Sequence, residues 1–326
     1  MKKIYFLLFC SKQIGLGHLV QSIELAFFLK KNFEINFIIN NNLFAKNLLK
    51  KNKFKFITHN ISPGNTLNFD NKLFMDHILI IDVPFNKIFL KYKQKSILFS
   101  NSNKKIISNC NINVCTHVKQ NNFKYNHNFI IDRKYSIFNK IYSEKNNNKE
   151  CILVCLGGTD KRNILKDLII SLSKLDLFHN YNLIVFINNF YKHSPSTKEL
   201  LYIKNHFNNV NYIENFSYAS KYLAKAKLVI TSGGNFFMNC INNKIPNISI
   251  PSSVNEEQTS HYYFNNNCTL MKFKFNLSNK IIIKKISKYL SSEFNNIGYK
   301  SFRKNIIGDH TFLKNDIIIK KVIKLL

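Results

Sequence analysis

The sequence is short of acidic residues and of arginine, and this shortage limits what its charge can mean. Its 326 residues contain 48 Lys and Arg against 18 Asp and Glu, a formal net charge of +30. A nucleic acid, an anionic membrane surface or an acidic substrate could each explain such a charge. The lysines are spread along the whole chain, however, and Lys, Asn, Ile and Phe are all abundant, as AT-rich codon usage produces. We therefore expect no nucleic-acid partner and leave a weak membrane-surface association open.

Patterns typical of zinc sites and membrane proteins are also missing. The seven cysteines form no C-x-x-C pair, which argues against a structural zinc site and favours a reducing, cytoplasmic compartment. No apolar run is long enough to span a membrane. The run Ile4–Cys10 follows two lysines and mimics a signal peptide, but it is short and no small-residue cleavage site follows it. It therefore predicts a first strand.

Two common nucleotide-binding signatures are incomplete. No Lys-Ser or Lys-Thr follows a G-x4-G spacing, so the P-loop of ATPases is absent. The turn with Gly15 and Gly17 has Val20 where a dinucleotide-binding turn has its third glycine. The sequence thus gives little support to an ATPase or a dehydrogenase, and we expect no cofactor and no metal.

What the chain does contain is three glycine turns, each between a strand-like and a helix-like run. In the first turn, Gly15 and Gly17 allow close backbone approach, and free N–H groups at the start of the following helix attract phosphate. His18 carries the only ring in this turn that exchanges a proton near neutral pH. A lone turn of this kind is also common in α/β proteins, so a structural His18 remains an alternative.

The first half of the chain alternates short apolar runs with helix-like segments. We expect strands at Ile4–Cys10, Glu34–Ile39, Phe54–Thr58, His77–Asp82, Ser96–Ser100 and Ile112–Thr116. Such runs predict a parallel sheet covered on both faces, the doubly wound arrangement. Ligands of these sheets bind outside the carboxyl ends of the strands, where both His18 and Asp82 fall.

A second alternating series follows the polar stretch Ser143–Glu150, which we interpret as a linker. Its glycine turns, at Gly157-Gly158 and Gly233-Gly234, could hold a diphosphate by backbone dipoles without a metal. We therefore predict an α/β protein with two doubly wound Rossmann-like domains that face each other across a cleft. The domains are expected at residues 1–145 and 150–310, followed by a C-terminal helix at residues 311–326.

Taken together, the three turns resemble those of a known family. Gly15-Leu16-Gly17-His18 fits the G-x-G-H signature of the GT-B-type UDP-sugar hydrolases of pseudaminic acid synthesis. The seven residues from Gly157 to Asn163 fit the G-G-[ST]-D-x-x-N signature of the same hydrolases. The chain is similar, more distantly, to the UDP-GlcNAc transferase that makes lipid II.

The resemblance implies a hydrolase that removes UDP from a UDP-linked deoxy-diacetamido sugar. In this family, the histidine equivalent to His18 activates a water molecule, which attacks the anomeric carbon and displaces UDP. Asp82 would orient the ring or bind a sugar hydroxyl, and capping of a turn is an equal alternative for it. The other residues expected to bind substrate are Gly15, Gly17, Gln21, Gly157, Gly158, Thr159, Asp160, Asn163, Gly233, Gly234, Asn235, Asn239 and Gln258.

The chain departs from the family pattern at two of these positions. Gln21 stands where the family usually has an arginine, and Asn239 replaces a glutamate that grips the ribose. Two other functions therefore stay open. One is a glycosyltransferase that uses a UDP-sugar with a lipid or glycan acceptor, and the other is a non-catalytic paralogue that binds nucleotide sugars. The oligomeric state is left open.

Overall fold

The computed structural model of the chain describes residues 2–11, 17–61, 64, 66–85, 87–100, 107–115, 129–131, 151–157, 160–176, 181–187, 205, 210–213, 219–265 and 267–294. These residues fall into two compact units, the first up to residue 131 and the second from 151 to 294. The predicted linker and the predicted C-terminal helix lie outside the described residues, so the domain boundaries stay predictions.

The first unit is built on a sheet of seven parallel strands, in the order β10-β9-β7-β5-β1-β2-β3. Its strands are β1 (Lys3–Leu8), β2 (Glu34–Ile39), β3 (Lys55–Thr58), β5 (Ile78–Asp82), β7 (Ser96–Ser100), β9 (Ile112–Cys115) and β10 (Phe129–Ile131). From β1 the chain first builds outward through β2 and β3, and then returns to β5 on the other side of β1. The sheet therefore has its topological switch point between β1 and β5.

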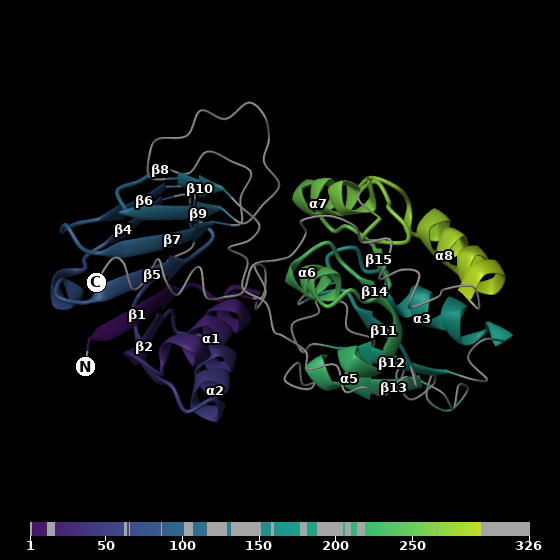
Figure 1. Cartoon of the computed structure of the whole chain (residues 1–326), viewed down its shortest axis with the longest axis horizontal. Helices are drawn as coiled ribbons and strands as arrows, with labels where there is room; N and C mark the ends of the chain where they lie inside the picture. Colours follow the sequence, from purple (N-terminus) through teal and green to yellow (C-terminus); the bar gives the residue numbers. More distant parts are fainter. Residues whose placement is uncertain are drawn as a thin grey trace. The chain divides into compact units, whose positions relative to one another are not determined.

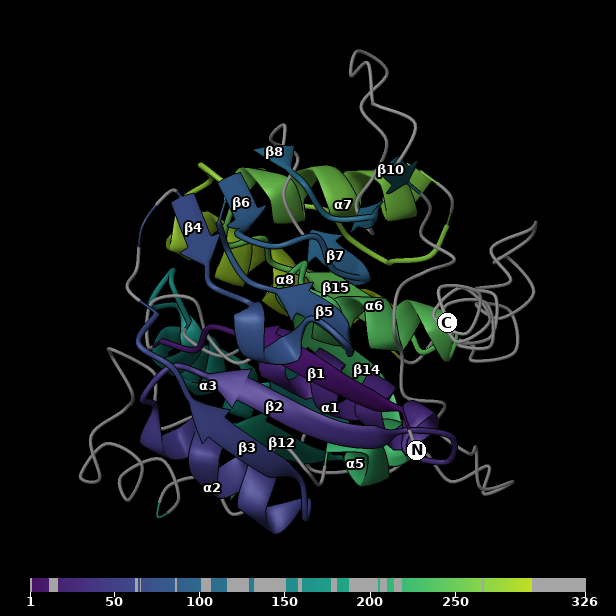
Figure 2. The same cartoon turned by 90° about the vertical axis from the view of Figure 1, so that its left-hand side faces the viewer.

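Different layers cover the two faces of this sheet (Figures 1 and 2). Helices α1 (Gly17–Leu29) and α2 (Leu43–Lys51) lie on one side. There Phe54, which follows α2, packs its ring against Phe27 of α1 and Phe37 of β2, with centroids 5.1 and 5.2 Å apart. These aromatic contacts bury the sheet face beneath the helices.

A second, three-stranded parallel sheet covers the opposite face. It consists of β4 (Thr66–Phe69), β6 (Lys87–Leu90) and β8 (Ile107–Ser108), with the short 3-10 helix η1 (Lys72–Phe74) after β4. Both β4 and β6 alternate exposed and buried residues, and their buried side chains join one apolar cluster with Leu79 and Ile81 of β5. The sequence analysis predicted cover on both faces but did not predict these strands.

The second unit has five parallel strands in the order β13-β12-β11-β14-β15. They are β11 (Cys151–Cys155), β12 (Asn182–Phe186), β13 (Val210–Ile213), β14 (Ala226–Thr231) and β15 (Asn247–Ser249). The switch point lies between β11 and β14, because the chain builds from β11 to β13 on one side and continues with β14 on the other.

Helices cover both faces of this second sheet, as Figure 1 shows. Helices α3 (Leu165–Ser173) and α8 (Asn279–Glu293) share one apolar cluster with the sheet. The other face packs against α5 (Ala219–Lys225) and α6 (Asn235–Asn242). Helix α7 (Val254–Asn265) follows β15. The prediction of two doubly wound, Rossmann-like folds is confirmed, with a sheet as one covering layer of the first unit.

Within the described ranges, the model contains no helix that is both long and apolar enough to cross a membrane. The cysteines whose surroundings the structure describes are buried thiols outside any disulfide: Cys10, Cys110, Cys151, Cys155, Cys240 and Cys268.

Candidate functional site

In the first unit, two predicted site residues meet at the switch point. Asp82 ends β5 and pairs in register with Leu8, the last residue of the adjacent β1. Helix α1 begins at Gly17, so His18 lies in its first turn. The ring Nδ1 of His18 is hydrogen-bonded to Oδ1 of Asp82. The side chain of Asp82 is only 1% exposed, whereas that of His18 is 14% exposed, so the ring separates the carboxylate from solvent.

This contact sets the charge and the tautomer of His18. Burial lowers the pKa of the imidazole, but the charge and the hydrogen bond of Asp82 prevail and raise this pKa above its usual range. A carboxylate only accepts hydrogen bonds, so in neutral His18 the proton resides on Nδ1. The Nε2 atom is then unprotonated and able to take a proton from a bound hydroxyl group.

The other residues of this region differ in their surroundings. Gly15 lies outside the described residues. Gln21 is one turn after His18 and is buried, at 6% exposure, so its predicted contact with substrate stays a prediction.

Cys10 follows β1 and is buried as well. Burial, and then the charge of Asp82, raise the pKa of the Cys10 thiol to about 12. Cys10 is therefore a neutral thiol and a poor nucleophile.

In the second unit, the predicted glycine turns lie side by side at the switch point. Cys155 of β11 and Thr231 of β14 are register partners, and each is followed within two residues by a glycine. Gly157 has a φ of +79°, which a residue with a side chain rarely adopts. A Cβ atom at Gly157 would lie 3.2 Å from Oγ of Ser232. Gly158 and Thr159 lie outside the described residues.

The D-x-x-N part of the family signature has a structural role in this fold. Asp160 and Asn163 have φ values of 34° and 51°, and the N–H of Asn163 donates to the Asp160 carbonyl at 2.8 Å. The buried Asp160 carboxylate accepts the N–H groups of Ile164 and Leu165, at 3.3 and 2.9 Å. It thereby caps α3 at its amino end. The predicted contacts of Asp160 and Asn163 with a ligand stay predictions.

Arg162, which the sequence analysis did not single out, holds this turn against the rest of the unit. Its guanidinium donates to the carbonyls of Pro251, Phe275 and Leu277 and to Oδ1 of Asn279. The amide of Asn279 donates back to the Arg162 carbonyl at 2.9 Å. The turn after β11 is thus fixed to Pro251, between β15 and α7, and to the segment that leads into α8.

The first turn of α7 places a carboxylate beside the third glycine turn. Oε2 of Glu256 accepts the N–H and the hydroxyl of Ser252, at 2.6 and 2.7 Å. A Cβ atom at Gly234 would lie 3.2 Å from the other oxygen, Oε1. At Gly233, a Cβ would come within 2.6 Å of the Glu256 carbonyl, so only glycine fits there. The sequence analysis missed Glu256, although an acid in the first turn of a helix is a recognisable signal for an ordered carboxylate.

The remaining predicted residues lie on α6 and α7. Asn235 is exposed and begins α6. Asn239 lies one turn further along, and its buried Oδ1 has no hydrogen-bond partner among the described residues. Gln258 lies on α7, one turn before His261. The structure therefore places Asn235 and Asn239 on the helix that follows the third glycine turn.

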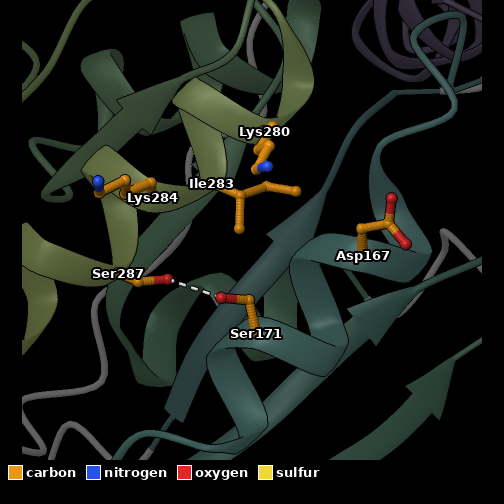
Figure 3. Close-up of a pocket in the computed structure, with 6 residues that line it drawn as sticks. All are labelled: Asp167, Ser171, Lys280, Ile283, Lys284 and Ser287. Atoms are coloured by element: carbon orange, nitrogen blue, oxygen red, sulfur yellow. Dashed lines mark hydrogen bonds between the residues drawn. The ribbon is translucent and has the colours of Figure 1, made fainter.

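Neither of two surface cavities of the described structure is lined by the predicted site residues. One, of about 550 Å³, lies between α3 and α8 (Figure 3) and is lined by Asp167, Ser171, Lys280, Ile283, Lys284 and Ser287. Its two serine hydroxyls point toward one another, 2.9 Å apart. The other, of about 480 Å³, lies at the amino-terminal edge of the first sheet. Among the described residues, no group of three His, Cys, Asp or Glu side chains could hold a metal ion.

Comparison with solved structures agrees with the fold. The chain is similar to the crystal structure of Acinetobacter baumannii MurG, with a TM-score of 0.55, 10% identity, and 99% and 100% of the two chains covered. It is similar to the glycosyltransferase of kitacinnamycin, with a TM-score of 0.61, 8% identity and full coverage of both chains.

A third similar structure is UDP-GlcNAc 2-epimerase from Neisseria meningitidis bound to UDP-GlcNAc, with a TM-score of 0.58 and 8% identity. This match covers 98% of the present chain and 100% of the epimerase. No protein-family model matches the sequence, and no curated protein matches it either. At such low identities, these matches identify a GT-B-like fold and do not identify the reaction.

Proposed function

We propose that this chain is an enzyme that transfers a sugar from a nucleoside diphosphate, most favourably UDP, to a hydroxyl group. The observation that supports it best is the His18–Asp82 pair at the carboxyl ends of β1 and β5. A base with this tautomer suits reactions in which a hydroxyl group must lose its proton as it attacks. The glycine turns of the second unit suit the nucleotide.

In the proposed reaction, Nε2 of His18 takes the proton of the attacking hydroxyl, whose oxygen forms a bond to the anomeric carbon of the sugar. The bond from that carbon to the phosphate oxygen breaks, and the nucleoside diphosphate leaves with the electron pair. Asp82 stabilises the imidazolium that results, in the way a buried carboxylate supports a catalytic histidine. A diphosphate is a good leaving group when N–H dipoles stabilise its charge, so no strong general acid is required.

Within the second unit, we assign different roles to the neighbouring turns. Asp160 already accepts the first N–H groups of α3, so the turn at Gly157 would hold phosphate through the backbone N–H groups of the turn itself. Glu256, next to Gly234, carries a negative charge that disfavours phosphate and favours hydroxyl donors. We therefore assign the diphosphate to the turn at Gly157 and hydroxyl groups of the ligand to Glu256, rather than diphosphate to both turns.

Transfer to an acceptor and transfer to water differ only in the attacking hydroxyl. The signature that suggested a hydrolase includes Asp160 and Asn163, and both have a structural role here. Similar solved structures are described as glycosyltransferases, and one holds thymidine diphosphate. These observations favour transfer to a lipid or glycan hydroxyl over hydrolysis. Removal of UDP from a deoxy-diacetamido sugar is the second candidate.

The test is to incubate the full chain with a panel of UDP- and TDP-sugars and to measure the released nucleotide, with and without glycan and lipid acceptors. Acceptor-dependent release supports transfer, whereas equal release without an acceptor supports hydrolysis. Calorimetry with UDP, TDP and ADP is run in parallel. Binding without any turnover would mean a non-catalytic nucleotide-sugar-binding protein, and tighter binding of ADP than UDP would contradict the nucleotide assignment.

A further inference from the structure

Asparagine side chains extend the parallel strand pairs of the first unit beyond the ends of the strands. After β2 ends at Ile39, Oδ1 of Asn40 accepts the N–H of Cys10, and Nδ2 of Asn40 donates to the Cys10 carbonyl, both at 2.8 Å. An amide side chain offers the same donor and acceptor as a peptide group. The Asn40 amide therefore continues the hydrogen bonding between β1 and β2 where the backbone of β2 turns away.

The same pairing occurs in the small sheet. Asn109 follows β8, and its amide makes two hydrogen bonds of 2.8 Å with the N–H and carbonyl of Leu90 at the end of β6. The register is also the same. If the strand register is continued by one residue, each asparagine has a register partner on the neighbouring strand. In each case, its amide binds the residue that follows this partner. Among the described residues, Asn40 and Asn109 thus make the same pairing in the same register at different places.

Asn40 differs from Asn109 in the segment to which it is hydrogen-bonded, which is the carboxyl end of β1. Cys10 lies two residues after Leu8, the register partner of Asp82, and the Cys10 thiol is close enough to respond to the Asp82 charge. From Cys10 the chain continues through the first glycine turn to His18. Asn109, by contrast, joins two strands of the small sheet, which carries neither His18 nor Asp82.

We propose that Asn40 is a positioning residue for His18. Its amide fixes the carboxyl end of β1 and thereby the geometry between the His18 ring and the Asp82 carboxylate. The effect on turnover rests on the proposed function. The effect on the His18 ring does not, since it concerns the folded protein alone.

The experiment compares Asn40→Ala with Asn109→Ala in the full chain. Both variants lose the same two hydrogen bonds, and urea unfolding reports the stability that each loses. Turnover, affinity for UDP, and the titration of the His18 ring by NMR are measured for both. The His18 signal is assigned by its disappearance in His18→Asn.

We expect Asn40→Ala to lower kcat by about 10- to 100-fold, because misplacement of a base by about 1 Å has effects of that size. UDP affinity should stay unchanged, and the pKa of His18 should move toward its usual value. In the His18→Asn background, Asn40→Ala should cause no further loss. Asn109→Ala should leave both kcat and the His18 titration unchanged.

An unchanged His18 titration in Asn40→Ala, or an equal loss of kcat in Asn109→Ala, would overturn the proposal. If the wild-type protein shows no turnover, the proposed function fails, while the His18 titration still decides the role of Asn40. If Asn40→Ala does not fold, Asn40→Ser is measured in the same way, because its hydroxyl retains one polar partner for the Cys10 backbone.

Discussion

At the residue scale, His18 is where the chemistry of the first unit can be tested directly. Replacing His18 by Asn removes the base but keeps a polar side chain of similar size at the start of α1. We expect kcat to fall by about 10²- to 10⁴-fold, as is typical when a positioned base is lost, and UDP affinity to stay unchanged. Stopped assays of nucleotide release, together with calorimetry, measure both. Near-normal turnover in the variant would end the assignment of the base.

The pH dependence follows from the direction of the His18 pKa. Only neutral His18 accepts a proton, so activity should rise with pH through a pKa that lies above the usual value for histidine. Replacing Asp82 by Asn leaves burial as the main influence, which lowers this pKa. The acidic limb of the pH–rate profile should therefore shift to lower pH, and kcat should fall by about 10- to 100-fold.

The same pair makes stability depend on pH. A histidine whose pKa is raised in the folded state stabilises the protein fully below its unfolded pKa, and this contribution is lost as the pH rises through the folded pKa. Wild-type protein should thus exceed Asp82→Asn in stability most clearly in mildly acidic buffer. A difference that instead grows toward alkaline pH would contradict the ion pair.

The positions of His18 and Asp82 near strand ends could be inferred from the sequence, because a residue at the carboxyl end of a parallel strand can be recognised from the strand that precedes it; their roles stay predictions. The sequence did not predict Glu256, since that carboxylate reaches the site only through its contacts with Ser252 and the glycine turn. The signature that contains Asp160 predicted a ligand contact, which stays a prediction, and did not indicate that its side chain caps α3.

At the scale of elements, the closeness of Gly233 to α7 predicts a steric requirement. Replacing Gly233 by Ala would bring a Cβ within 2.6 Å of the Glu256 carbonyl and 2.7 Å of its Cβ, so the start of α7 must move. We expect a loss of about 1–3 kcal/mol in the free energy of unfolding, as for other overpacked sites. Gly64→Ala is the matched control, because nothing lies within 4 Å of a Cβ there. Equal stability of the two variants would show that the turn is not constrained by α7.

The amino end of α3 gives a second prediction for an element. Asp160→Ala removes the acceptor for the N–H groups of Ile164 and Leu165, and should lower the free energy of unfolding by about 1 kcal/mol. Asp160→Asn keeps one acceptor oxygen and tolerates the positive φ, so it should restore most of this stability. Urea unfolding of the three proteins measures the effect. A variant Asp160→Ala as stable as the wild type would contradict the capping of α3 by Asp160.

Which elements the sequence predicts depends on their length and their pattern. The buried strands β1 and β5 are continuous apolar runs, and their predicted bounds agree with the structure within one or two residues. By contrast, β4 and β6 have four residues each, with only two buried side chains per strand. Their position is determined by packing on the larger sheet, which no local pattern indicates.

At the scale of the whole molecule, the formal charge of +30 predicts a strong dependence on salt. Repulsion among the spread lysines destabilises the compact state. Raising the ionic strength from about 0.01 M to about 0.15 M shortens the screening length from roughly 30 Å to roughly 8 Å. The urea midpoint should therefore rise with sodium chloride, and equally with sodium fluoride if screening is the cause. A midpoint that stays constant or falls would show that the charge has no such cost.

The buried cysteines have a practical consequence. The thiolate is the form that alkylating reagents attack, and burial raises the pKa of both Cys10 and Cys155 to about 12. Each thiol therefore reacts only when its strand end opens to solvent, so the rate of labelling measures how often that opening occurs. Cys10 reports on the first unit, while Cys155 and Cys240 report on the second. With mass spectrometry to identify each labelled peptide, the labelling rates of the natural cysteines report the local opening of each unit separately.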